Sequence, residues 1–364
     1  MQIELTCSKC GKSYSGKTLV VHCEDCGGML DFSPSIPFDP AQIERTRGGV
    51  WRYAHVYPLP ADTSRVTLGE GGTPLVWTQI SSRTVGLKME SQNPTGSYKD
   101  RGTCVLVSHL VNCEVKEAVE DSSGNAGASF AAYAARAGLR ARIFIPASAS
   151  GPKRKQIEEY GAELVTVEGA RSAASLAVQQ EVRRGAVYAS HAYSAFWLAG
   201  LTSLAYEIWE DMQAVPGSII APVGHGGLMT GLVRGFQALQ NSGVTHGMPF
   251  FLGVQANTCA PLASAFARGA AEPGSVDEGQ TLAEGIRVRN PSHGVELLTL
   301  FQRGMGAFTG IDEQDILPAR SELAQQGISV EPTSAVVWHA ANQWIGKLPE
   351  PILLIMSGSG LKYQ

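Results

Sequence analysis

The residue best suited to carry out chemistry in this chain is Lys99, which lies in a turn-rich stretch before an apolar run. Residues 93–102 read Asn-Pro-Thr-Gly-Ser-Tyr-Lys-Asp-Arg-Gly, and residues 103–110 are mostly apolar. Such a turn can hold one lysine at the mouth of a helix, where partial desolvation favours the neutral amine that forms a Schiff base. A lone lysine is usually a solvated surface group, so the interpretation depends on what accompanies Lys99.

The first accompanying loop covers residues 121–127 and reads Asp-Ser-Ser-Gly-Asn-Ala-Gly. Its small residues let the backbone approach a ligand, and the free N–H groups of the helix that follows offer a seat for a carboxylate. Asn125 adds a side-chain donor suited to a phenolic oxygen. Taken alone, the loop is equally well an ordinary strand-to-helix turn in which Ser and Asn act as caps.

A second loop, residues 222–228, reads Pro-Val-Gly-His-Gly-Gly-Leu between a predicted strand and a predicted helix. Three glycines at a helix N-terminus form an anion nest that fits a phosphate. The loop is not a dinucleotide fingerprint, because Met229 stands where that pattern requires a third glycine. The phosphate of a smaller cofactor fits best, although glycines of this kind also serve simply to pack a strand against a helix.

The third loop, residues 356–362, follows the last predicted strand and contains Ser357. If the bound cofactor carries a pyridine ring, a neutral hydroxyl beside the ring nitrogen would not hold that ring protonated. The cofactor would then be a moderate electron sink, suited to elimination and replacement more than to transamination. On its own, this loop is a glycine-rich C-terminal turn.

These motifs, in this order, resemble those of fold type II pyridoxal-phosphate enzymes, most of all threonine synthase and its close paralogues, from about Leu68 to the end of the chain. The resemblance implies an α/β fold with two parallel-sheet domains of the tryptophan-synthase-β-like superfamily, and Lys99 as the catalytic Schiff-base lysine. It also implies that Asn125 contacts the ring oxygen and Ser357 faces the ring nitrogen. The cofactor phosphate would be held by Gly224, His225, Gly226, Gly227 and Leu228. The substrate carboxylate would meet Ser122, Ser123 and the amide of Ala126.

One segment departs from the family pattern. Residues 194–200 read Ser-Ala-Phe-Trp-Leu-Ala-Gly where threonine synthases usually have Asn-Pro-Tyr-Arg-Leu-Glu-Gly. Trp197 therefore stands where an arginine would grip the substrate phosphate, and an aromatic ring cannot replace that bidentate clamp. Lys153 and Lys155 could supply positive charge instead, or they are the solvated first turn of a helix.

The expected activity is that of a pyridoxal-phosphate-dependent carbon–oxygen lyase, with conversion of O-phosphohomoserine to threonine as the family default. Trp197 favours the main alternative, a serine/threonine dehydratase (ammonia-lyase), or a β-replacement synthase acting on another activated amino acid. A third hypothesis is a non-catalytic ribbon protein that binds a partner, and the intact Lys99 argues against it.

Four of the seven cysteines form two Cys-x-x-Cys pairs near the start of the chain, Cys7 with Cys10 and Cys23 with Cys26. Two such pairs can supply four thiolates to one tetrahedral zinc ion, and a segment as small as residues 1–34 needs such a metal to fold. We expect a zinc-ribbon-like segment that is separate from the cofactor site. The alternatives are a metal-free ribbon or a redox pair, but a redox pair normally opens a helix, and neither pair does so.

The bulk composition excludes several classes of function. The 364 residues are 44% hydrophobic and 17% charged with a net charge of -4, so the chain can fill a large core and has no basic field for nucleic acid or an anionic membrane. The first residues lack a secretory signal pattern, and no apolar stretch is long enough to span a bilayer. We expect a cytoplasmic homodimer that acts on a small amino acid, with Cys104, Cys113 and Cys259 reduced.

Apolar strands and helices alternate along the rest of the chain. A helix is predicted over residues 126–137 and ends at Gly138, and strands are predicted over residues 142–145, 163–167, 218–223, 250–255 and 351–356. Alternation of this kind indicates βαβ units and parallel sheets. The predicted domains are a large cofactor-binding domain, residues 35–90 and 205–364, and a small domain, residues 91–204, with Lys99 and the carboxylate loop.

Overall fold

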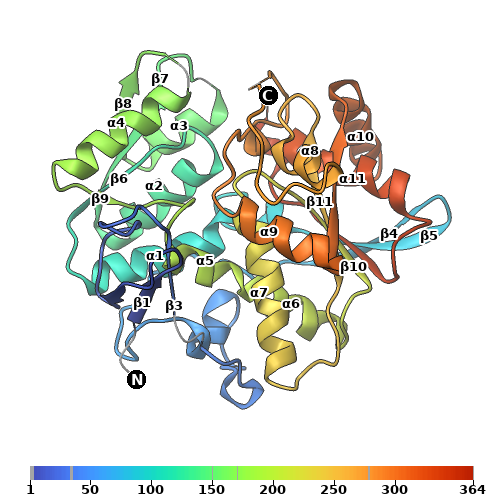
Figure 1. Ribbon diagram of the computed structural model, residues 1–364, viewed down its shortest axis with the longest axis horizontal. Coiled ribbons are helices and arrows are strands. Elements are labelled where there is room, and N and C mark those ends of the chain that lie inside the picture. Colours follow the sequence, from blue (N-terminus) through green and yellow to red (C-terminus); the bar gives the residue numbers. More distant parts are fainter. Residues whose placement is uncertain (1–3, 33–35, 150, 170, 278, 364) are drawn as a thin grey trace. The chain divides into compact units, whose positions relative to one another are not determined.

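The computed structural model describes the chain apart from residues 1–3, 33–35, 150, 170, 278 and 364. It divides into two compact units (Figure 1). Unit 1 comprises residues 1–71 and 99–200, and unit 2 comprises residues 72–98 and 201–364. The ends of the predicted cysteine segment, residues 1–3 and 33–34, and the first residue of the predicted large domain lie outside the described residues.

Unit 2 is built on a six-stranded sheet with the strand order β12-β11-β10-β13-β5-β4. Its strands are β4 (Leu75–Ile80), β5 (Arg83–Lys88), β10 (Ser218–Pro222), β11 (Phe250–Ala256), β12 (Gly306–Ile311) and β13 (Ile352–Ile355). All neighbours pair in parallel, as predicted, except β4 with β5. The antiparallel edge was not expected; it arises because Ser81 and Ser82 take φ values of 48° and 69°, which close a two-residue hairpin turn.

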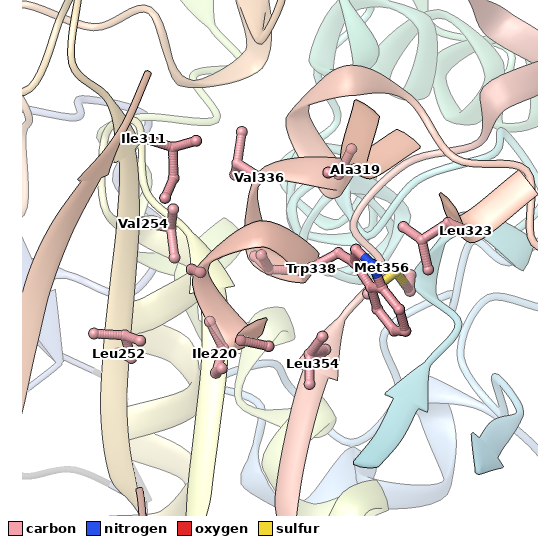
Figure 2. Packing of buried hydrophobic residues seen from close by; sticks show 14 of the residues in the cluster. Ile220, Leu252, Val254, Ile311, Ala319, Leu323, Val336, Trp338, Leu354 and Met356 are labelled. Atoms are coloured by element: carbon pink, nitrogen blue, oxygen red, sulfur yellow. The ribbon is translucent and has the colours of Figure 1, made fainter. Parts of the chain in front are cut away.

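The helices of unit 2 cover a sheet that is apolar on both faces. They are α6 (Ser203–Met212), α7 (Gly227–Asn241), α8 (Pro261–Ala267), α9 (Gly294–Leu300), α10 (Glu313–Gln325) and α11 (Pro332–Trp344). Figure 2 shows Val336 and Trp338 of α11 within the core cluster, with the Trp338 ring beside Met356 and Leu354. Strands buried on both faces read as continuous apolar runs, and for this reason the sequence located β10, β11 and β13.

Unit 1 contains a parallel four-stranded sheet with the order β8-β7-β6-β9. Its strands are β6 (Glu117–Glu120), β7 (Arg140–Pro146), β8 (Glu163–Val167) and β9 (Val187–Tyr188). Its helices are α1 (Lys99–Asn112), α2 (Asn125–Ala137), α3 (Pro152–Glu159), α4 (Arg171–Arg183) and α5 (Ala195–Leu201). Helix α2 ends where predicted, because Gly138 takes the left-handed conformation at φ 68°.

Short helical turns complete the described chain. They are η1 (Pro40–Gln42), η2 (Val50–Val56), η3 (Glu90–Gln92), η4 (Glu284–Ile286), η5 (Phe301–Met305) and η6 (Gly360–Lys362). None of the helices in the described part of the chain has both the length and the apolar character needed to cross a membrane.

The two Cys-x-x-Cys pairs lie in a small antiparallel sheet, β2-β1-β3, which we call the ribbon (residues 4–32). Its strands are β1 (Glu4–Cys7), β2 (Ser13–Ser15) and β3 (Leu30–Phe32). The ribbon packs on α1, where His109 Nε2 lies 3.1 Å from the carbonyl oxygen of Thr18. The ribbon is therefore in contact with the helix that Lys99 begins, although the sequence alone had indicated a separate module.

The boundaries between the two units differ from the predicted domain boundaries. Trp51 bonds to the Val66 carbonyl, and the Val66 amide bonds to Ser108 of α1, so the described residues of 36–71 belong to unit 1. The amide of Ser91 bonds to the Met356 carbonyl, which ties residues 91–98 to unit 2. Both differences come from long-range hydrogen bonds that leave no local signal in the sequence.

Candidate active site and cysteine cluster

Lys99 is the first residue of α1, directly after a turn that is hydrogen-bonded to the Ser357 loop. The turn closes through the Gly96 amide and the Asn93 carbonyl at 2.7 Å, with Gly96 at φ 82°. The Tyr98 amide then donates to the Ser357 carbonyl at 3.1 Å. Tyr98, which donates this hydrogen bond to Ser357, directly precedes Lys99 in the chain.

The half-buried side chain of Lys99 lies against the indole of Trp197, with Nζ 5.1 Å from the ring centroid. Trp197 is 2% exposed, and its Nε1 donates to Thr103 Oγ1 at 3.4 Å. A Cβ at Gly102 would lie 2.6 Å from three atoms of the same ring. Trp197 is therefore a fixed aromatic wall beside the lysine amine, in the geometry of a cation–π contact.

The predicted carboxylate loop lies at the start of α2, next to the start of α1. Ser129 of α2 donates to Asp100 of α1 at 2.7 Å, which joins the first turns of the two helices. The N-cap residue of α2, Gly124, has no side chain that could cap the helix, and helix N-termini of this kind commonly bind anions. Ser122, by contrast, accepts the Gly124 amide through its hydroxyl oxygen at 3.2 Å.

Close packing fixes this loop. A Cβ at Gly127 would lie 1.8 Å from the Ser122 carbonyl oxygen and 3.2 Å from Ile157 of α3. Helix α3 therefore packs beside the loop and also carries the two lysines considered for substrate charge. Lys155 is exposed and Lys153 is half-buried.

Sequence reasoning missed a buried pair behind the same loop. His191 Nδ1 lies 2.5 Å from Glu120 Oε1, and Glu120 ends β6 just before residue 121. The His191 ring also lies edge-on to Trp197, with centroids 6.1 Å apart. The two residues are 71 positions apart in the chain, and no spacing in the sequence connects them.

In unit 2, the glycine loop and the Ser357 loop follow β10 and β13, which are neighbours in the sheet. A Cβ at Gly224 would lie 2.9 Å from the Gly285 carbonyl oxygen, and Gly226 takes φ 96° against His293. Only glycine fits both positions. The carboxyl ends of adjacent parallel strands are the usual place for a ligand in such sheets.

Two buried hydroxyls support a polar ligand here. Thr230 Oγ1 in the first turn of α7 and Ser97 Oγ just before Lys99 have no hydrogen-bond partner within the described residues. Helix α7 begins after Gly226 without a side-chain cap. Buried hydroxyls normally find partners, so a nest of glycines beside an orphaned threonine fits a phosphate group.

His225 and Leu228 complete the predicted phosphate loop. The His225 carbonyl accepts the His293 amide at 3.0 Å, and the His225 ring lies 3.4 Å from Ser292 Oγ. Leu228 is buried at 3% exposure and anchors α7 in the core. Burial of the neighbouring Glu296 opposes its ionisation, but the hydrogen bond with His293 and the charge of Arg234 lower the pKa of Glu296 to about 2.

Ser357 is 1% exposed and has a partner that sequence reasoning did not identify, Ser334 of α11. The two hydroxyl oxygens lie 3.0 Å apart, and Ser334 Oγ also accepts the Gly358 amide at 2.9 Å. Ser334 thereby fixes the orientation of the hydroxyl expected to face a ring nitrogen. The residue comes from a helix, not from a glycine-rich loop, and nothing in the local sequence marks it.

The four ribbon cysteines converge: their sulfur atoms all lie within 4.8 Å of one another. Cys7 Sγ is 3.4 Å from Cys26 Sγ, and Cys10 Sγ is 3.6 Å from Cys23 Sγ. Sulfurs that each lie about 2.3 Å from one tetrahedral zinc ion are roughly 3.8 Å apart, so the cluster has the size of such a site.

Hydrogen-bond donors favour the thiolate forms of two of these cysteines, Cys7 and Cys23. Tyr14 donates its hydroxyl to Cys23 Sγ at 3.2 Å, and this hydrogen bond lowers the pKa of Cys23 to about 6. The Lys9 amide points at Cys7 Sγ at 3.4 Å. A Cβ at Gly28 would lie 2.6 Å from Cys7 Sγ, so the backbone passes as close as a metal knuckle requires. The donor set thus fits a structural metal.

Comparison with known proteins identifies the class to which these features belong. Residues 66–358 match the family model described as "Pyridoxal-phosphate dependent enzyme". The chain belongs to this family, and within it to the threonine-synthase-like lyases. The expected fold type and the expected cofactor class are therefore confirmed.

The similar curated proteins are threonine synthases. That of Methanosarcina acetivorans is 31% identical over 91% of this chain and 84% of its own length. That of Methanocaldococcus jannaschii is 32% identical over 98% of this chain and 92% of its own length. These alignments extend over nearly the whole chain.

Solved structures share the fold. Maize serine racemase gives a TM-score of 0.69 at 22% identity and covers 79% of this chain and 88% of that one. The L-serine ammonia-lyase of Rhizomucor miehei gives a TM-score of 0.69 at 21% identity and covers 79% of this chain and 93% of that one. Likeness at these identities concerns the fold alone.

Proposed function

We propose that this lyase acts on an amino acid with a leaving group at Cβ or Cγ, with Lys99 as its catalytic residue. Lys99 would hold the cofactor through its amine, and the same amine, once free, would move the substrate α-proton as a general base. The observation that carries this proposal is the hydrogen bond from the Tyr98 amide to the Ser357 carbonyl, because it ties the lysine turn to the loop expected to meet the ring nitrogen.

Pyridoxal 5'-phosphate, when bound, supplies an electron sink for negative charge at the substrate Cα. We assign its phosphate to residues 224–228, with Thr230 as an additional donor because its buried hydroxyl lacks a partner among the described residues. Asn125 is assigned to the ring oxygen. Ser357 is assigned to the ring nitrogen, with its hydroxyl oriented by Ser334.

The substrate carboxylate is assigned to Ser122, Ser123 and the Ala126 amide. Support comes from the uncapped start of α2 and from the tight packing that holds the loop in place. Lys153 and Lys155 are the proposed source of positive charge for a substrate phosphate, since α3 packs beside the loop through Ile157. Of the two, Lys153 is the better buried.

Two reactions compete for this site. The threonine synthase relatives favour conversion of O-phosphohomoserine to threonine and phosphate. Trp197, which occupies the position of the expected arginine, favours a serine or threonine ammonia-lyase or a β-replacement reaction. Incubation with a panel of amino acids and phosphoamino acids separates them: threonine plus phosphate marks the first, and a 2-oxo acid plus ammonia marks the second. If no member of the panel is turned over, the lyase assignment fails for these substrates.

We further propose one structural zinc ion in the ribbon, held by Cys7, Cys10, Cys23 and Cys26. The support is the convergence of the four sulfurs and the hydrogen bonds that favour the thiolate forms of Cys7 and Cys23. A zinc ion bound by four thiolates has no open position and serves folding, not catalysis.

We also propose a division of labour between the units and a cytoplasmic homodimer. Residues 205–364 would bind the cofactor phosphate and ring nitrogen, and the small domain would carry Lys99 and the carboxylate loop. Val76 and Trp77 are 40% and 47% exposed on the edge strand β4, which supports burial of that edge against a second copy. Light scattering should give twice the chain mass, and Trp77→Arg should lower it. Free cysteines outside the ribbon fit a reducing compartment.

A further inference from the structure

The ribbon contacts the rest of unit 1 through aromatic rings. Its partners lie in α5 and in the segment just before it, and α5 carries the indole beside Lys99. Phe32 of β3 meets Phe196 of α5 edge-on, with ring centroids 5.0 Å apart. His22 meets Tyr193 at 4.4 Å. A narrow apolar crevice continues the same interface and is lined by Leu5 and Leu30 of the ribbon. The ribbon therefore packs on the segment that leads into Trp197.

Phe196 is held from a second side by the lysine helix. His109 of α1 stacks on it with centroids 3.5 Å apart and planes at 11°, and Phe196 is 3% exposed. His109 in turn hydrogen-bonds the Thr18 carbonyl of the ribbon. One phenyl ring is thus clamped between the ribbon and α1, and the first turn of α5 cannot move without disturbing this clamp.

The next residue after Phe196 is the aromatic wall beside the amine. Trp197 contacts Gly102 and bonds Thr103, both on α1, and its ring lies 5.1 Å from Lys99 Nζ. A small rotation of the first turn of α5 would therefore move the indole relative to the amine. Misplacement of a reacting group by about 1 Å is enough to cost about a hundredfold in rate.

We propose that the ribbon is a positioning element for the reaction: through Phe32 and Phe196 it fixes the first turn of α5, and so sets the place of the Trp197 indole beside Lys99. Phe196 is a positioning residue and does not itself touch the reacting atoms. The inference rests on the proposed function only in taking Lys99 as the lysine that bonds the cofactor.

The test uses the full chain and pyridoxal phosphate as the probe. Phe32→Ala and Phe196→Ala remove the two halves of the clamp. Phe308→Ala is the matched control, since Phe308 is a phenylalanine of unit 2 at 6% exposure whose ring packs on Phe301. For each variant, the rate of Schiff-base formation at Lys99 is followed by absorbance, and amide hydrogen exchange is measured over residues 195–201.

We expect Phe32→Ala and Phe196→Ala to slow Schiff-base formation by about tenfold and to speed exchange over residues 195–201. Phe308→Ala should lower the melting temperature with neither effect, and Phe32→Leu should recover most of the rate. Equal slowing of Schiff-base formation in all three alanine variants would mean that the clamp contributes only to the stability of the fold, and it would overturn the proposal. An unchanged rate of Schiff-base formation in Phe32→Ala, in a chain whose ribbon has detached, would also overturn the proposal. If the wild-type chain forms no Schiff base, the proposed function fails, and the exchange measurement alone decides whether the clamp holds α5.

Discussion

Trp197 determines what can approach Lys99 from the α5 side. Its indole is 2% exposed, and it lies against Gly102 and hydrogen-bonds Thr103. The ring presents an apolar edge and one N–H donor that already has a partner. An arginine there would offer a planar fork of donors that matches a phosphate, and the loss of that fork leaves a phosphorylated side chain without its strongest partner.

We therefore predict weak turnover of O-phosphohomoserine. A charge-assisted bidentate contact is worth roughly 1.5–3 kcal/mol, so its absence should cost about one to two orders of magnitude in kcat/KM. Trp197→Arg should raise kcat/KM for this substrate, whereas Trp197→Leu, which opens the same space without charge, should not. Efficient wild-type turnover that is lost in Lys153→Ala would show that the phosphate site has moved to α3.

At the scale of elements, two glycines bring α1 and α5 into close contact. A Cβ at Gly102 would lie 2.6 Å from the Trp197 ring, and a Cβ at Gly200 would lie 2.1 Å from the Arg101 carbonyl oxygen. Neither distance is possible for a real Cβ, so an alanine at either position must separate the helices. The lysine helix and the helix of its aromatic wall are packed without room for adjustment.

Gly102→Ala should destabilise the protein by about 1–3 kcal/mol, the usual cost of overpacking a core, and should slow Schiff-base formation because the indole must shift. Gly346→Ala is the control, since a Cβ at Gly346 meets nothing within 4 Å. Denaturant unfolding compares the stabilities. Equal midpoints for Gly102→Ala and the wild type would contradict the close packing of α1 on α5.

The contact between α1 and the ribbon includes a histidine that is buried without charge. His109 is 3% exposed, and burial lowers its pKa to about 4, against the opposing effect of the Thr18 carbonyl. Its unfolded-state pKa is about 6.5. Between these values the unfolded chain binds a proton that the folded chain does not, so stability falls as the pH drops from about 6.5 to about 4.

We predict that docking of the ribbon weakens over that range, by at most about 3 kcal/mol at its lower end. Once the intrinsic pH dependence of amide exchange is divided out, the protection of residues 17–22 should be lower at pH 5 than at pH 7. His109→Phe keeps an aromatic ring beside Phe196 but cannot titrate, so its protection should depend less on pH in the same metal-saturated buffer. The same loss of protection in both proteins would assign the effect to other groups, such as the ribbon thiols.

Local sequence patterns predicted the secondary-structure elements and the loops, but they did not predict contacts between residues that are far apart in the chain. The strand over residues 163–167 and the helix end at Gly138 are found where the apolar run and the glycine indicated. The Glu120–His191 pair and the partner of Ser357 were missed, because their members are joined only by the fold. The role of each predicted site residue remains a proposal, since residue type and loop position do not define chemistry by themselves.

At the scale of the whole molecule, the ribbon is a small module whose fold depends on its four cysteines. It has three short strands and few buried apolar side chains, and a module of that size needs a metal to hold it. The proposed zinc ion would also support the helix that begins at Lys99, because the ribbon packs on α1.

Metal analysis should find one zinc ion per chain. Cys10→Ser should lose the metal and speed hydrogen exchange over residues 4–32, because Cys10 is exposed and its loss removes a ligand without emptying a core position. Cys259→Ser is the matched control, at a buried cysteine of unit 2. Zinc retained in full by Cys10→Ser would rule out the four-thiolate site.

The most direct test of the account is to find which lysine bonds the cofactor. The chain is saturated with pyridoxal phosphate, reduced with borohydride and mapped by peptide mass spectrometry. We predict a yellow protein with the label on Lys99 alone, and a Lys99→Ala variant that folds, takes no label and has no turnover, whereas Lys155→Ala takes the label as the wild type does. A label on Lys88 or Lys153, or no label in the wild-type chain, would contradict the central claim that Lys99 carries the chemistry.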